Sequence, residues 1–139
     1  MASHADDLAS RAEQSHAGQL AVGHHARGVG VVTLRGEHDL STQPVLARAL
    51  ALAAAYSNVV VDLSECAFID STVIKELIRT SKTVRAGGDQ LILVIPPEQA
   101  QVARIAKIVR LGEIFEVHES KDAAFARLEQ AERHEDLAT

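Results

Sequence analysis

Aromatic residues are scarce in this chain: they make up 3% of its 139 residues, and tryptophan is absent. The hydrophobic core must therefore be built mainly from aliphatic side chains. Single-stranded nucleic acids stack on aromatic side chains, so this scarcity argues against such a partner. Positive charge is not in excess either, since 14 Lys and Arg stand against 19 Asp and Glu, which gives a net charge of −5. Direct binding to a nucleic-acid backbone is therefore disfavoured.

Cysteine and long apolar runs are also nearly missing. The one cysteine, Cys66, cannot form an intramolecular disulfide, which fits a reducing compartment. It precedes the apolar run Ala67-Phe68-Ile69, so we expect a buried, inert thiol. No apolar stretch approaches the roughly 20 residues that span a bilayer, and residues 1–19 lack the apolar run of a signal peptide. We therefore expect a cytoplasmic protein with no membrane insertion.

Apolar residues alternate between short β-like runs and helical spacing. The glycine-rich stretch 23–30 predicts a hairpin turn, and Ser64–Ala67 predicts a second turn. The expected strands cover residues 20–22, 29–36, 58–63, 91–95 and 114–117. The expected helices cover residues 44–56, 71–86, 98–111 and 121–133, with Ser41 and Thr42 as candidate caps of the first.

Two strands, 59–63 and 91–95, are almost continuously apolar, which is typical of strands buried on both faces of a parallel sheet. Strand–helix–strand crossovers of this kind are right-handed. We expect one α/β domain over residues 19–133, between a flexible tail at 1–18 and a frayed end at 134–139. Its four- to five-stranded mixed sheet should have parallel core strands, an N-terminal antiparallel hairpin and about four flanking helices.

The helix at 98–111 has two predicted faces. Its inward residues include Val102 and Val109, and Gly112 is expected to end it. The outward face carries a basic stripe that either meets an acidic partner or is simply solvated. The stripe consists of Arg104, Lys107 and Arg110.

Ser71 is placed at the start of the predicted helix 71–86. A hydroxyl there lies where backbone N–H groups and the helix dipole tolerate a phosphate. An ordinary cap or first-turn serine would occupy the same position. Asp70 is expected to cap the helix, Thr72 to serve as a cap or second phosphate acceptor, and Asp39 to stabilise a turn.

Motifs of catalysis are missing around these residues. Ser71 is flanked by Ile69 and Val73, not by the glycines of a nucleophile elbow. No glycine-rich phosphate loop or paired metal-ligand spacing is found. We therefore expect a non-enzymatic protein with no cofactor and no metal.

Four segments, in order between about Leu20 and Leu128, together resemble the STAS domain family, the fold of bacterial anti-sigma factor antagonists. The first is a strand followed by a Gly-Glu-x-Asp motif, the second a strand ending in Asp-Leu-Ser, the third a phosphorylation loop and the fourth a last strand. In this chain they are Val32–Asp39, Val60–Ser64, Phe68–Thr72 and Ile114–Val117.

The resemblance implies a regulatory function. In this family the unphosphorylated domain binds a serine kinase that is also an anti-sigma factor, which releases the sigma factor for transcription. Phosphorylation of the serine after the loop aspartate ends that binding. That serine corresponds to Ser71, with Thr72 as the second choice, and the implied partner-binding positions are Asp39, Asp70, Ser71, Thr72, Val73 and Ile74.

One position departs from the family pattern. Anti-sigma factor antagonists usually have glycine where this chain has Val73, so either the partner surface differs or Val73 makes an apolar contact. A stressosome-like scaffold or other divergent signalling module, and an accessory subunit of a membrane transporter, therefore stay as alternatives. A homodimer is also left open.

Overall fold

The computed structural model describes the backbone of residues 19–25 and 28–138 and the side chains of residues 20–25 and 28–131. The expected tail at 1–18 lies outside the described residues. The strands are β1 (Gln19–His25), β2 (Val29–His38), β3 (Asn58–Ile69), β4 (Leu91–Val94) and β5 (Glu116–His118). The helices are η1 (Leu40–Thr42, a 3₁₀ turn), α2 (Gln43–Ala54), α3 (Ser71–Ala86), α4 (Ala100–Ile108), α5 (Leu111–Ile114) and α6 (Lys121–Ala138).

The five strands form one mixed sheet in the order β1-β2-β3-β4-β5. β1 pairs with β2 in antiparallel orientation, and the remaining neighbours are parallel. The predicted α/β sheet with an N-terminal antiparallel hairpin is therefore confirmed. β3 lies at the centre, as its continuously apolar sequence indicated.

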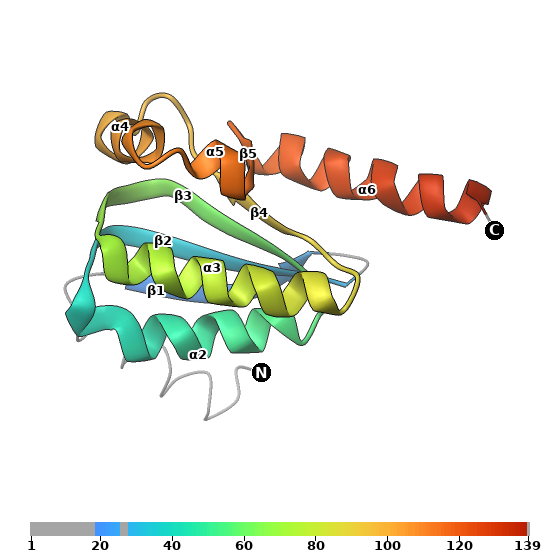
Figure 1. Cartoon of the computed structure of the whole chain (residues 1–139), viewed down its shortest axis with the longest axis horizontal. Coiled ribbons are helices and arrows are strands. Elements are labelled where there is room, and N and C mark those ends of the chain that lie inside the picture. The colour runs from blue at the N-terminus through green and yellow to red at the C-terminus, as the bar shows by residue number, and fades with distance from the viewer. Residues whose placement is uncertain (1–18, 26–27, 139) are drawn as a thin grey trace.

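Helices cover both faces of the sheet (Figure 1). Successive strand residues point to opposite faces, so Val59 and Val61 enter a different core from Val60. The larger core lies under α2 and α3, while α6 covers the opposite face through Ala124 and Leu128. Residues on both sides of the first half of β3 and of β4 are therefore buried, which explains the apolar runs Val59–Val61 and Leu91–Val94.

Helix α2 lies unusually close to strand β2. The closest approach is at Gly30, where an added Cβ would lie 2.3 Å from the carbonyl oxygen of Ala53. The neighbouring backbone atoms of Ala53 would be 2.7 and 2.8 Å away. Only glycine leaves room for the helix backbone at this position.

Two strands are longer than predicted. The expected turn at Ser64–Ala67 is wrong, because β3 continues to Ile69 and pairs there with His38 of β2. β2 likewise continues past Gly36, whose positive φ of 73° accompanies a register shift. Pairing between the two strands thus overrides the turn-like local sequence.

The hairpin turn is shorter than the predicted stretch 23–30. β1 extends to His25, which pairs directly with Val29. The tip of the turn, residues 26–27, lies outside the described residues. The glycine-rich stretch therefore overestimated the length of the turn.

The predicted helix at 98–111 is interrupted. α4 ends at Ile108, and Arg110 adopts a left-handed conformation with φ 55° before α5 begins. Gly112 lies inside α5 and does not end a helix. Val109, expected to face the core, is 41% exposed as a result.

The C-terminal elements also differ from the prediction. Ile114 ends α5, so the last strand begins at Glu116 and not at Ile114. α6 extends to Ala138, beyond the predicted helix end at residue 133, and the frayed end at 134–139 stays a prediction. In the part of the chain that the structure describes, no helix combines the length and apolarity needed to cross a bilayer.

Candidate functional site

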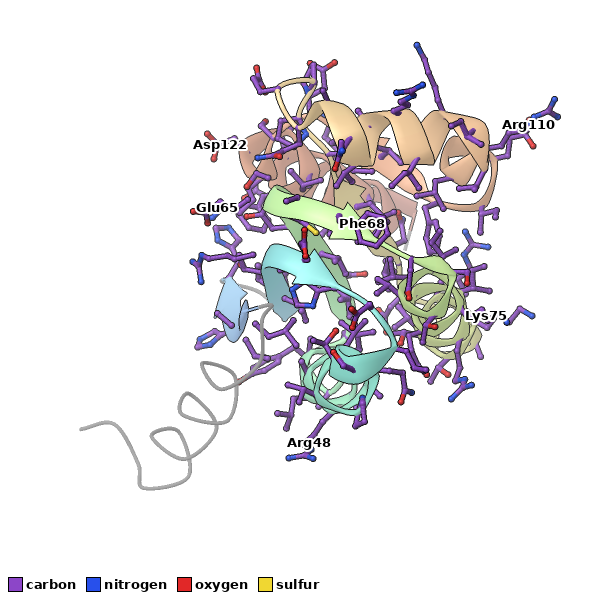
Figure 2. All side chains as sticks on the ribbon, turned by 90° about the vertical axis from the view of Figure 1, so that its left-hand side faces the viewer. Arg48, Glu65, Phe68, Lys75, Arg110 and Asp122 are labelled. Atoms are coloured by element: carbon purple, nitrogen blue, oxygen red, sulfur yellow. The ribbon has the colours of Figure 1, made fainter. Side chains whose placement is uncertain are left out.

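Two neighbouring strand ends bring the sequence motifs together. His38 and Ile69, the last residues of β2 and β3, are paired in the sheet. Asp39 and Asp70 follow them directly, and each begins a helical segment. We call this edge of the sheet the strand-end face; Figure 2 views the molecule from this side, with Phe68 near the centre.

Asp70 caps helix α3. Its backbone is extended, and its carboxylate oxygen Oδ1 accepts hydrogen bonds from the amides of Thr72 at 2.9 Å and Val73 at 3.1 Å. These two amides would otherwise lack a partner in the helix. The predicted capping role is therefore confirmed, and the cap determines where the helix begins.

Replacing Asp70 by alanine is expected to lower the free energy of unfolding by about 1 kcal/mol, because the two amides lose their acceptor. Urea denaturation followed by circular dichroism measures the change. Asp70→Asn is the matched control and should retain most of the stability, since asparagine caps helices about as well. Equal losses in the two variants would contradict a capping role.

Asp39 organises the short η1 turn. Its carboxylate accepts hydrogen bonds from the Ser41 amide at 2.9 Å and the Ser41 hydroxyl at 2.6 Å. The side-chain hydrogen bond from Ser41, followed by the backbone one, lowers the pKa of Asp39 below its usual value. The expected turn role is confirmed, and the carboxylate is negatively charged at neutral pH.

The buried side chain of His38 contacts both sides of the η1 turn. Its ring is fully buried, with Nε2 at 2.9 Å from the carbonyl oxygen of Arg35 and Nδ1 at 3.3 Å from Thr42 Oγ1. Thr42 Oγ1 in turn donates to the carbonyl oxygen of Asp39 at 3.0 Å. These contacts hold the chain between strand β2 and helix α2 in place at Arg35 and at Thr42.

A buried polar contact holds the two helix starts together. Glu76, in the second turn of α3, accepts a 2.7 Å hydrogen bond from the side-chain amide of Gln43 at the first position of α2. Arg79 lies 3.4 Å from the same carboxylate oxygen. This contact links the start of α2 to the second turn of α3, and local sequence patterns did not indicate it.

Ser71 and Thr72 differ in accessibility. Ser71 is the first residue of α3 and is exposed, whereas Thr72 is half-buried and its amide is bonded to Asp70. One turn further along α3, the Lys75 side chain projects outward into solvent (Figure 2). Ser71 therefore presents the more accessible hydroxyl of the two.

Val73 does not lie on the surface. Its side chain is fully buried in the core beneath α3, and Ile74 packs against the same core. The apolar contact expected of Val73 is therefore made with the core of the domain, and the expectation that its side chain contacts a partner is corrected. A valine at this position points away from the strand-end face, so the surface beside Ser71 is formed by other residues.

Two apolar side chains on this face were not indicated by any sequence motif. Leu40 is 71% exposed between Asp39 and Ser41, and Phe68 is 39% exposed near the end of β3. The available clue was the position of Leu40, an apolar residue inside a polar turn. The exposure of Phe68 depends on the extension of β3, which the sequence pattern did not show.

Cys66 lies below this face. It is fully buried, as expected, and its sulfur donates to the carbonyl oxygen of Phe68 at 3.4 Å. Burial raises the pKa of the Cys66 thiol to about 11. The thiol is therefore protonated at neutral pH, which makes it a poor nucleophile.

Comparison with known families agrees with the sheet order and the strand-end motifs. Residues 23–124 match the family model of the STAS domain. The chain therefore belongs to the STAS domain family. No match was found among curated proteins.

Solved structures show the same fold. An anti-sigma factor antagonist from Mycobacterium paratuberculosis is 27% identical, with a TM-score of 0.66 over 79% of this chain and 92% of that one. The anti-sigma factor antagonist SpoIIAA in its unphosphorylated form is 18% identical, with a TM-score of 0.63 over 79% and 97%. The phosphorylated form of the Bacillus cell fate determinant SpoIIAA is 17% identical, with a TM-score of 0.60 over 78% and 98%. The SpoIIAA structures, at these identities, are evidence for the fold alone.

Proposed function

We propose that this protein is an anti-sigma factor antagonist. It binds an anti-sigma factor that is also a serine kinase, through the strand-end face, and phosphorylation of Ser71 ends the binding. Membership of the STAS family and the similarity to the mycobacterial antagonist support this role. Release of a sigma factor in this way regulates transcription. The transcription machinery acts in the cytoplasm, so this role places the protein there.

The observation that carries the proposal is the position of Ser71. Its hydroxyl is exposed at the first residue of a 16-residue helix, directly after the capping Asp70. A kinase can reach such a hydroxyl without opening the fold. SpoIIAA, whose fold this chain shares, has been solved in both unphosphorylated and phosphorylated forms, which supports a fold that accommodates such a phosphate.

The surroundings of Ser71 indicate how a phosphate would act. The amides of Thr72 and Val73 already donate to Asp70, so they are not free to hold a new phosphate. A phosphoserine carries about −1.5 to −2 charges at neutral pH. Placed beside the Asp70 carboxylate, it is repelled and projects into solvent, where it changes the charge of the face.

The same phosphate would leave the fold intact. Helix α3 is anchored in the core by Val73, Leu77 and Val84, all of which are buried. Loss of partner binding therefore follows from charge and bulk on the surface. A partner that packs on the exposed Leu40 and Phe68 would also have to bury the phosphate. Because burying a charge is costly, that apolar contact would be lost.

Phosphorylation itself is the direct test. Incubation with the cognate anti-sigma factor kinase and ATP should place a single phosphate on Ser71, as mapped by peptide mass spectrometry. Ser71→Ala should remove the modification. Ser41→Ala is the matched control, because Ser41 is an exposed serine at the neighbouring helix start, and it should be phosphorylated like the wild type. An unmodified Ser71, or a fully phosphorylated Ser71→Ala variant, would refute the proposal.

A further inference from the structure

Exposed apolar residues are concentrated in one short segment outside the strand-end face. Among the described residues, eight large hydrophobic side chains are exposed, and four of them fall within residues 108–117. They are Ile108 at 71%, Val109 at 41%, Ile114 at 38% and Val117 at 36%. Apolar surface gathered in this way marks interaction sites more often than single scattered residues do.

Val117 lines a groove between α4, α5 and β5, and the other three residues are sequence neighbours of its lining residues Lys107, Arg110 and Glu113. Its volume is about 390 Å³. The apolar part of the lining comes from Ile95, Ala103, Ala106 and Val117. The two alanines have small side chains, which leaves the groove open between helix α4 and the edge of the sheet.

Cationic side chains line the groove beside this apolar floor. Lys107 and Arg110 contribute to the lining, and Arg104 lies one turn earlier on α4. One acid, Glu113, is also present, at 3.8 Å from Arg110. Both side chains of this pair are at least 70% exposed, so the ion pair is weak and leaves the site basic. This basic site lies on a chain whose net charge is −5.

The groove depends on the break between the two helices. Arg110 adopts a left-handed conformation, with φ 55° and ψ 48°, that residues other than glycine rarely take. Ile108 and Val109, just before the break, are exposed, and α5, just after it, contributes Gly112 and Glu113 to the groove lining. Unfavourable backbone conformations of this kind are often kept at binding sites.

We infer that this groove binds an acidic amphipathic helix of a partner protein. The apolar face of such a helix would cover the groove floor and the exposed apolar residues beside it. Its acidic flank would face Lys107 and Arg110. A second copy of this chain is disfavoured, because a symmetric contact would place the same cations opposite one another. The site is separate from Ser71: in Figure 2, Arg110 lies at the outer end of the upper helical layer, away from Phe68.

A designed peptide tests this inference with the full-length protein. The probe is a fluorescein-labelled helix of about four turns, with leucines at i, i+3, i+4 and i+7 and glutamates on both flanks. Fluorescence anisotropy should show saturable binding that weakens as salt is added. Peptides with lysine in place of glutamate, or serine in place of leucine, are the matched controls and should bind at least roughly tenfold more weakly.

Protein variants locate the binding. Lys107→Glu combined with Arg110→Glu should weaken binding of the acidic peptide by about tenfold or more, and Ile108→Ser by several-fold. Glu113→Gln should strengthen it by roughly threefold, because a competing carboxylate is removed. All four side chains are exposed, so thermal melts should stay close to that of the wild type.

Ser71→Glu distinguishes the groove from the proposed phosphorylation switch and should leave peptide binding unchanged. The inference is overturned if no saturable binding is seen, if the lysine peptide binds equally well, or if the Lys107 and Arg110 reversals have no effect. It is also overturned if sedimentation shows a dimer in which Ile108→Ser restores the monomer, because a second copy would then cover the groove.

Discussion

Replacing Ser71 by glutamate is expected to weaken binding to the anti-sigma factor kinase by at least about 100-fold, or about 2.7 kcal/mol. The new carboxylate would lie beside Asp70, whose side chain already takes the amides of Thr72 and Val73. These two amides are therefore not available to neutralise the new charge. A partner surface that packs on Leu40 and Phe68 would have to remove this charge from water. Isothermal titration calorimetry with the purified kinase measures the affinity.

Ala123→Glu is the matched control for that experiment. It adds the same charge to the first turn of another helix, α6, at an exposed position. Binding should remain within roughly threefold of the wild type, as it should for Ser71→Ala, which adds no charge. Wild-type affinity in Ser71→Glu, or an equal loss in Ala123→Glu, would show that the charge at Ser71 does not control binding.

Replacing Gly30 by alanine is expected to lower the free energy of unfolding by about 3 kcal/mol or more. The added methyl group would lie 2.3 Å from the carbonyl oxygen of Ala53, well inside contact distance. The obstructing atoms belong to the backbone of α2, so the helix itself must move away from the sheet. Such a loss is a large part of the stability of an ordinary domain, about 5–15 kcal/mol. Urea denaturation, with the slope compared between variants, measures it.

Gly23→Ala is the control for the effect of replacing a strand glycine. Gly23 lies on the neighbouring strand β1, and an added Cβ there meets no atom within 4 Å. Its stability should stay close to the wild-type value or rise slightly, because alanine restricts the unfolded chain. If both variants lost the same stability, the cause would be strand propensity and not the approach of α2.

Features governed by neighbouring residues were predicted well. The start of α3 at Ser71 follows from the capping Asp70, and its end follows from Gly87 and Gly88. The central, doubly covered position of β3 follows from the run Val59–Leu63, because only a strand buried on both faces lacks an alternating pattern. The burial of Cys66 could be predicted for a similar reason, from its apolar neighbours.

Features governed by distant residues were not predicted from the sequence. The turn predicted at Ser64–Ala67 is part of β3, because hydrogen bonds to β2 stabilise an extended backbone that the local sequence does not favour. Val109 is exposed because the chain breaks at Arg110, although its helical spacing predicted burial. Val73 provides the opposite case: the motif suggested a surface residue, and packing of α3 on the sheet buries it.

The sequence by itself determined the α/β class, the helix that begins at Ser71 and the family-like loop around it, because caps, glycine stops and apolar spacing act within a few residues. Only the tertiary structure decided what surrounds Ser71. The pairing of His38 with Ile69 places Asp39 beside Asp70, and the contact between Gln43 and Glu76 fixes the two helix starts. Sheet pairing and side-chain packing join residues about 30 positions apart, and no local pattern encodes such a distance. The composition of the strand-end face therefore depends on the folded chain as a whole.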